Sequence, residues 1–145
     1  MSKLLARARV KRENAEHNYI RIGIDDAYLD DCCYNLQQCI EFCLKYIVEM
    51  NGEHYVESHD IRAQLNKLKG LGVTLPFEPQ LRYMASTLNS WEAESRYNDE
   101  FTAVLEDVEE ARTLASEALA YCDGLVTELP EEPQDVDSLS PKKIE

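Results

Sequence analysis

The apolar residues of this chain recur at intervals of three and four positions, which is the spacing of one face of an α-helix. No segment alternates apolar and polar residues over the length of a strand, so the pattern predicts no sheet. It predicts four long helices and one short one, over about residues 2–22, 25–50, 59–69, 79–97 and 98–127. Long helices with short connections indicate an all-α fold, an antiparallel up-and-down bundle of four main helices plus one short helix.

Glycine, proline and capping residues predict where these helices begin and end. The Asn51-Gly52 pair is expected to end the second helix, because glycine readily adopts the left-handed conformation that follows a helix. Ser58 is the expected N-cap of the short helix, and Pro79 suits the first turn of the next one. Asn98 either caps a separate fifth helix or marks a kink in a continuous one.

The apolar positions of three helices predict the core. In the first helix the inward residues are expected to be Leu5, Ala8, Ala15, Tyr19 and Ile22. In the second they are Leu29, Cys32, Leu36, Cys39 or Ile40, Cys43, Ile47 and Met50. In the fifth they are Phe101, Val104, Leu105, Val108, Ala111, Ala115, Ala118, Leu119, Cys122 and Leu125.

Charge is spread unevenly over the 145 residues, whose formal net charge is −13. Residues 1–12 hold five basic side chains and no acid, whereas residues 128–137 hold five acids and no base. So acidic a surface repels phosphate backbones outside a local basic patch, which counts against a general nucleic-acid binder and against DNA as a ligand. The chain is expected to form one domain over residues 1–127, followed by an acidic, disordered tail over 128–145 with three prolines and little to bury.

The location predicted for the protein is the cytoplasm. Uninterrupted apolar runs are only a few residues long, so no membrane span or membrane partner is expected. The first residues are basic and amphipathic and lack the apolar core of a secretion signal. Four of the five cysteines fall within one predicted helix, where disulfide geometry is hard to reach, and this favours a reducing compartment.

Cysteine and histidine do not form a predicted metal site, and no cofactor is expected. Cys32, Cys39 and Cys43 share one face of a helix, but a single helix cannot surround a tetrahedral ion. These cysteines are better interpreted as small hydrophobic residues buried in the core. His54 and His59 lie five apart, without further ligands near them in the sequence.

Several short motifs give the chain a resemblance to a known family. Glu41, Lys45 and Gly52 lie in and after the second helix, His59-Asp60-Ile61 opens the short helix, and Trp91 precedes Arg96-Tyr97. On these motifs the sequence resembles the HEPN domain family over roughly residues 2–127. The resemblance implies a small helical bundle, generally homodimeric, of a family tied to RNA cleavage, nucleotide binding and toxin–antitoxin pairs. The resemblance also implies that the protein is prokaryotic.

The ribonuclease motif of that family is missing where it is expected. In HEPN ribonucleases an Arg is followed four to six residues later by a His, and the chemistry needs no metal. Arg96 has no His in this range. Arg12 and His17 meet the spacing, but they lie on the first predicted helix, where chance explains the pair.

By resemblance, the expected function is that of an accessory or nucleotide-binding protein, partnered with a small nucleotidyltransferase in a toxin–antitoxin-type module. The candidate residues for binding nucleotide or partner are His59, Asp60, Trp91, Arg96, Tyr97 and Asn98. Arginine binds phosphate and an aromatic ring can stack on a base. A structural interpretation stays open, with Trp91 filling the core, Arg96 bridging to an acid such as Asp60, and His59 docking the short helix.

Two other functions remain alternatives. One is a divergent ribonuclease with Arg96 as the phosphate ligand and His59 or His17 as the base. The other is an inert helical adaptor that binds only protein. An RNA ligand is compatible with the first alternative, and the acidic surface favours the second.

Overall fold

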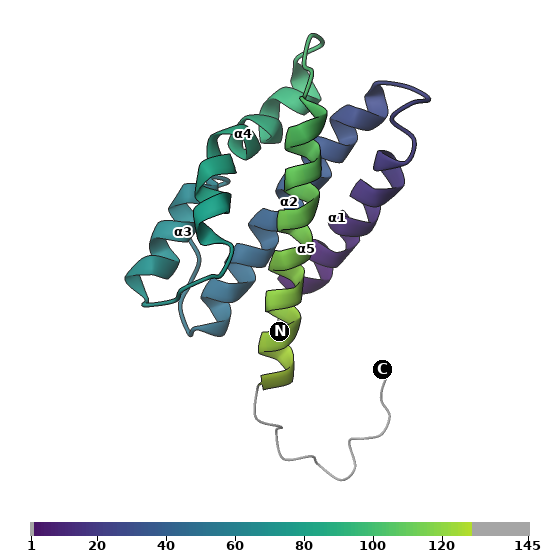
Figure 1. Cartoon of the computed structure of the whole chain (residues 1–145). Helices are drawn as coiled ribbons and strands as arrows, with labels where there is room; N and C mark the ends of the chain where they lie inside the picture. Colours follow the sequence, from purple (N-terminus) through teal and green to yellow (C-terminus); the bar gives the residue numbers. More distant parts are fainter. Residues whose placement is uncertain (1, 129–145) are drawn as a thin grey trace, which may run out of the picture.

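The computed structural model of the chain describes residues 2–128, with side chains to residue 126. This part of the chain is all-helical and contains no strand, as the sequence pattern predicts (Figure 1). The helices are α1 (Leu4–Tyr19), α2 (Ala27–Met50), α3 (Ile61–Gly70), α4 (Glu78–Tyr97) and α5 (Leu105–Glu128). None of these helices is both long and apolar enough to cross a bilayer. The predicted acidic tail lies outside the described residues from position 129 onward.

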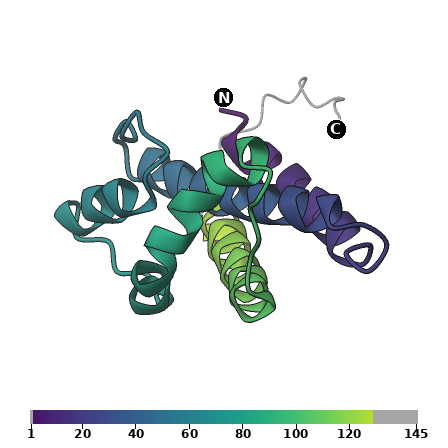
Figure 2. The same ribbon diagram turned by 90° about the horizontal axis from the view of Figure 1, so that it is seen from above.

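Helix α2 is the central element, and each of the other four helices packs against it. Figures 1 and 2 show α1 and α3 on opposite sides of the fold, with α2 between them. Every predicted inward position of α2 is buried except Met50, which is half-buried. The burial extends well beyond one stripe, because a helix surrounded by four others has little surface left for solvent. The further buried residues of α2 are Cys33, Gln37, Gln38, Glu41, Leu44, Lys45 and Val48.

The five cysteines lie in this core, all of them free and fully buried. Four belong to α2, and Cys122 of α5 packs against the same helix, with its Sγ 3.6 Å from the carbonyl oxygen of Cys43. Their environment is that of small apolar residues filling a helical core.

The end of α2 forms as predicted. Asn51 follows the last helical residue, and Gly52 adopts the left-handed conformation with φ +80°. The amide of Glu53 then donates to the carbonyl oxygen of Val48, closing the terminus.

The end of α1 differs from the prediction. The helix stops at Tyr19 rather than Ile22, and residues 20–24 form turns before α2. Ile20 and Ile24 are exposed as a result, while Ile22 still packs against the core. Leu5, Ala8 and Ala15 are buried as expected, and the small side chains of the two alanines let α1 lie close along α2.

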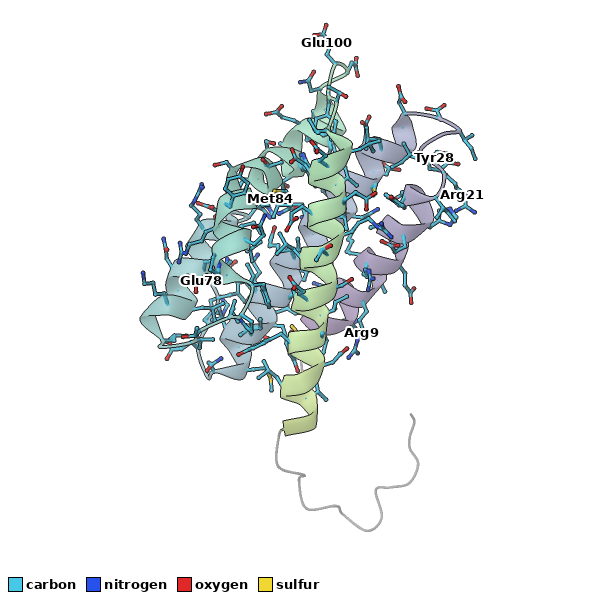
Figure 3. All side chains as sticks on the ribbon, viewed as in Figure 1. Arg9, Arg21, Tyr28, Glu78, Met84 and Glu100 are labelled. Carbon is cyan, nitrogen blue, oxygen red and sulfur yellow. The ribbon has the colours of Figure 1, made fainter. Side chains whose placement is uncertain are left out.

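Helices α4 and α5 are separate, so the continuous kinked helix is ruled out. Asn98 is the C-cap of α4, and its amide donates to the carbonyl oxygen of Glu94. Residues 98–104 then connect the helices, and Figure 3 shows Glu100 at the tip of this connection. Figure 1 shows it at the same end of the bundle as the turn between α1 and α2.

The start of α5 corrects two predicted core positions. Val104 and Leu105 are 57% and 55% exposed, because they precede the part of α5 that packs against α2. Leu114, absent from the expected inward face, is buried instead. Helical geometry places residues 111, 114, 115 and 118 on one surface, so the buried face is wider than the predicted stripe.

The start of α3 corrects the predicted cap. Asp60, and not Ser58, is the N-cap, and its carboxylate accepts a hydrogen bond of 2.9 Å from the Arg62 amide. The Ser58 hydroxyl instead accepts a hydrogen bond from the Asp60 amide. The helix begins two residues later than predicted, and the cap moves with it.

Candidate functional site

A buried carboxylate lies on the polar face of α2. Glu41 is only 1% exposed, and its Oε1 accepts a hydrogen bond of 2.8 Å from Gln37 Nε2. Its Oε2 lies 2.8 Å from Nζ of Lys45, which is also buried. Residues 37, 41 and 45 are four apart, so one side of the helix carries all three groups. A charge buried this deeply needs such partners, because desolvation otherwise makes it very costly.

His59 adds a titratable group to this buried carboxylate. The connection that follows α2 places His59 Nδ1 3.0 Å from Glu41 Oε2 and 3.2 Å from Glu41 Oε1. The imidazole is nevertheless 63% exposed. Glu41 therefore holds one ring nitrogen, and the other, Nε2, faces a second carboxylate, Glu92 of α4, at 3.9 Å.

Arg96 meets the same carboxylate from the next turn of α4. Its Nη2 donates to Glu92 Oε2 at 2.8 Å, and its Nε donates to the Glu92 carbonyl oxygen at 2.9 Å. His59 and Arg96 are 37 positions apart in the sequence, yet both lie against one oxygen atom of Glu92. The fold thus joins two of the candidate residues that the sequence could not place in space.

Aromatic rings continue the arrangement towards α1. The Arg96 guanidinium lies 4.7 Å from the ring centre of Tyr34 on α2 and 4.8 Å from that of Tyr97. Lys11 of α1 lies 5.2 Å from the Tyr34 ring centre. These distances are those of cation–π contacts. Two cationic side chains from different helices thus converge on one tyrosine.

We call Lys11, Tyr34, Glu41, Lys45, His59, Glu92 and Arg96 the His59–Arg96 site. It draws on α1, α2, α4 and the connection before α3. Its groups are one guanidinium, two ammonium groups, an imidazole, a phenol ring and two carboxylates, in a protein of net charge −13. Such a set can bind an anionic ligand that carries an aromatic group, and its imidazole can accept or donate a proton.

Asp60 has a structural task beside this site. Its Oδ1 caps α3 and also accepts a hydrogen bond of 2.8 Å from Asn89 Nδ2 of α4. Asn89 Oδ1 in turn accepts from the Ile61 amide at 2.9 Å. These bonds fix the start of α3 against α4 and so hold the neighbouring His59 in place. The sequence left open a structural role for Arg96, as an ion pair with an acid such as Asp60. Arg96 does form an ion pair, but its acidic partner is Glu92 rather than Asp60.

The remaining candidates lie elsewhere or point outward. Trp91 is 2% exposed and belongs to the core. Its accessible edge borders a surface pocket of about 320 Å³ that includes Asn98 and Phe101 but neither His59 nor Arg96. Tyr97 is exposed at the end of α4. The structure therefore groups His59 with Arg96, whose guanidinium also lies over the Tyr97 ring, and places Trp91 in the core and Asn98 beside a separate pocket.

Arg12 and His17 have different surroundings on α1. Arg12 is half-buried against α5, and its Nε has no hydrogen-bond partner among the described residues. His17 is exposed, and the backbone carbonyl of that residue accepts a hydrogen bond from Arg21. Within residues 2–128 the structure also brings together no group of three or more His, Cys, Asp or Glu suited to hold a metal ion.

Lys11, Tyr34 and Glu92 were not among the residues expected from the sequence. One signal was available, since Tyr34, Gln37, Gln38, Glu41 and Lys45 form a polar stripe at helical spacing within an otherwise apolar helix. The spacing of Glu92 and Arg96 also predicts an i,i+4 ion pair. No sequence signal points to Lys11, which reaches the site only because α1 packs along α2.

The motifs and the fold agree with a comparison to protein-family models. The protein-family model described as the HEPN domain matches residues 1–125 of the chain. The chain belongs to the HEPN domain family. This HEPN chain has no match at a significant level among curated proteins or among solved structures.

Proposed function

We propose that this HEPN protein is an accessory, nucleotide-binding component that works with a small nucleotidyltransferase in a prokaryotic toxin–antitoxin-type module. The observation that carries the nucleotide part is the convergence of Lys11 and Arg96 on the Tyr34 ring. The two cations provide contacts for phosphate oxygens, and the exposed ring of Tyr97 beside the half-buried ring of Tyr34 provides aromatic surface for a base. The nucleotidyltransferase part rests on the family, as does the expectation of a homodimer.

The nucleotide part is tested by calorimetric titration with AMP and ATP. Arg96→Ala is expected to weaken binding at least tenfold, because it removes the guanidinium without touching the core. Arg82→Ala is the matched control, since Arg82 also pairs with a glutamate four residues earlier on α4, at 2.7 Å, and its guanidinium donates to Asn66 of α3 rather than to a residue of the His59–Arg96 site. Equal affinity in wild type and Arg96→Ala contradicts the proposal, provided that both melt as folded proteins.

The partner is tested by a tagged pull-down from the native cell with intact masses of bait and prey. A nucleotidyltransferase-sized prey, or a bait that carries an added nucleotide, supports the paired module. A bare, unmodified bait without such a prey counts against it and favours a protein that acts alone or as an adaptor.

A second candidate function, a metal-independent ribonuclease, gains support from the contact of His59 and Arg96 with the same Glu92 oxygen. In this mechanism His59 Nε2 takes the proton of the attacking 2′-hydroxyl, and Arg96 stabilises the charge that develops on the phosphate. Glu41 holds Nδ1 and so orients the ring. Incubation of labelled RNA with the protein in chelator tests it. Cleavage that is lost in His59→Ala supports this activity, and absence of cleavage by wild type rules it out.

A further inference from the structure

Glu92 places a negative charge where a ligand phosphate is expected. Its side chain is 18% exposed, and its Oε2 lies 2.8 Å from Arg96 Nη2 and 3.9 Å from His59 Nε2. Arginine and histidine side chains can both contact phosphate oxygens. In the chain alone, both are turned towards a carboxylate of the protein itself.

We propose that the Glu92 carboxylate competes with the phosphate group of the ligand for Arg96 and His59. In the free protein the carboxylate occupies the phosphate position, and only a group with more negative charge displaces it. The proposal rests on the proposed nucleotide-binding function and adds the ligand class. A terminal phosphate carries a charge near −2 at neutral pH, whereas a carboxylate carries −1. The site therefore selects phosphomonoesters such as AMP over neutral nucleosides and over monoanions.

The contact between Glu92 and Arg96 is of a kind that a ligand can displace. It is an i,i+4 pair on one helix with a partly exposed guanidinium, and such pairs contribute little to stability. The carboxylate uses only one of the two terminal guanidinium nitrogens, through one oxygen. A phosphate can instead engage the guanidinium through two parallel hydrogen bonds, which is the stronger arrangement.

The backbone of α4 stays in place during this exchange. Arg96 Nε is held by the Glu92 carbonyl oxygen, a main-chain group that does not move when the carboxylate rotates away. The ring of His59 stays anchored through Nδ1 to Glu41. Displacement thus needs a change of rotamer at Glu92 and leaves the other ligand-binding groups where they are.

The test compares binding of AMP and of adenosine to the full-length chain by calorimetry. Glu92→Gln keeps the shape of the side chain and removes its charge, and it is expected to bind AMP at least tenfold more tightly than wild type. Adenosine, which has no phosphate, is expected to bind both proteins within a factor of two. Glu94→Gln is the matched control for net charge, because Glu94 is exposed on the same helix and lines the separate pocket beside Trp91.

Glu92→Ala serves as a second variant, so that a folding defect in one does not leave the result open. Tighter AMP binding by the Glu92 variants, with Glu94→Gln within twofold of wild type, supports the proposal. Unchanged AMP affinity in both Glu92 variants, with weaker binding by Arg96→Ala, overturns it and leaves the nucleotide-binding function standing. Weaker AMP binding by the Glu92 variants also overturns it, because Glu92 then positions Arg96. AMP binding by no protein in the set removes both proposals.

Discussion

His59 and Glu41 lie 18 positions apart, yet the His59 Nδ1 atom is 3.0 Å from a carboxylate oxygen of Glu41. The contact forms because the connection after α2 turns back along that helix before α3 begins. The next residue, Asp60, faces α4 and bonds to Asn89. Two adjacent residues therefore contact two different helices, His59 contacting α2 and Asp60 contacting α4. These contacts place His59 beside Arg96.

The charge of Glu41 is expected to be essential for stability. Glu41→Gln leaves the ammonium group of Lys45 buried without an opposite charge, and breaking a buried ion pair costs about 3–5 kcal/mol. Urea denaturation measures the loss. The double variant Glu41→Gln, Lys45→Met is expected to recover most of it, since no unpaired charge remains. Glu78→Gln, which breaks the more exposed pair with Arg82, is the control and is expected to cost less than about 1 kcal/mol. Similar losses for Glu41→Gln and Glu78→Gln contradict this account.

The capping role of Asp60 predicts a second difference in stability. Asp60→Ala removes the cap of α3 and the hydrogen bond from Asn89, for an expected loss of about 1–2 kcal/mol. Ser58→Ala removes only the hydroxyl that accepts from the Asp60 amide and is expected to cost less. Thermal unfolding of the two variants decides between the caps. A larger loss for Ser58→Ala restores the cap expected from the sequence.

Asp30 is expected to make stability depend on pH. Burial, and then repulsion from Asp31, Asp26 and Asp25, raises the pKa of Asp30 above its usual value. An acid whose pKa is higher in the folded state favours unfolding once it is ionised, and the penalty appears as pH rises through its range. Asp30→Asn is therefore expected to stabilise the protein at pH 7, by an amount that disappears below about pH 3.8, the usual value.

The control for this pH dependence is Glu117→Gln, which removes one negative charge from an exposed position of α5. Urea denaturation at pH 3 and pH 7 provides the comparison. A stabilisation by Asp30→Asn that is the same at both pH values, or is matched by Glu117→Gln, contradicts the assignment.

The cysteines are expected to resist thiol reagents in the folded protein. All five are buried, and burial raises the pKa of Cys32 to about 12, so that little reactive thiolate is present near neutral pH. Burial also raises the pKa of Cys33. A colorimetric thiol assay is expected to find no fast-reacting group in the native protein and five in urea. Rapid reaction of one thiol in the native state contradicts the buried placement of that residue.

The sequence predicted the fold because helical periodicity is a local property. The spacing of apolar residues in α1, α2 and α5 reports which side of each helix avoids water, whatever the partner helices are. Helix ends were predicted where a local feature decides them, as at Gly52. They were missed where tertiary packing decides, as at the early end of α1 and the late start of α5. The wide extent of burial around α2 was also missed, since periodicity in one helix does not state how many neighbours surround it.

For the site, the sequence by itself determined the chemistry available: a His-Asp pair before a short helix, and an Arg-Tyr pair at the end of a long one. Only the tertiary structure decided which groups meet. It turned Trp91 into the core and brought His59 and Arg96 to one oxygen of Glu92. It also carried Lys11 to Tyr34 across the packed pair α1 and α2. The physical reason is that a local pattern fixes the directions of side chains within one helix, whereas a site depends on how helices far apart in the sequence pack together.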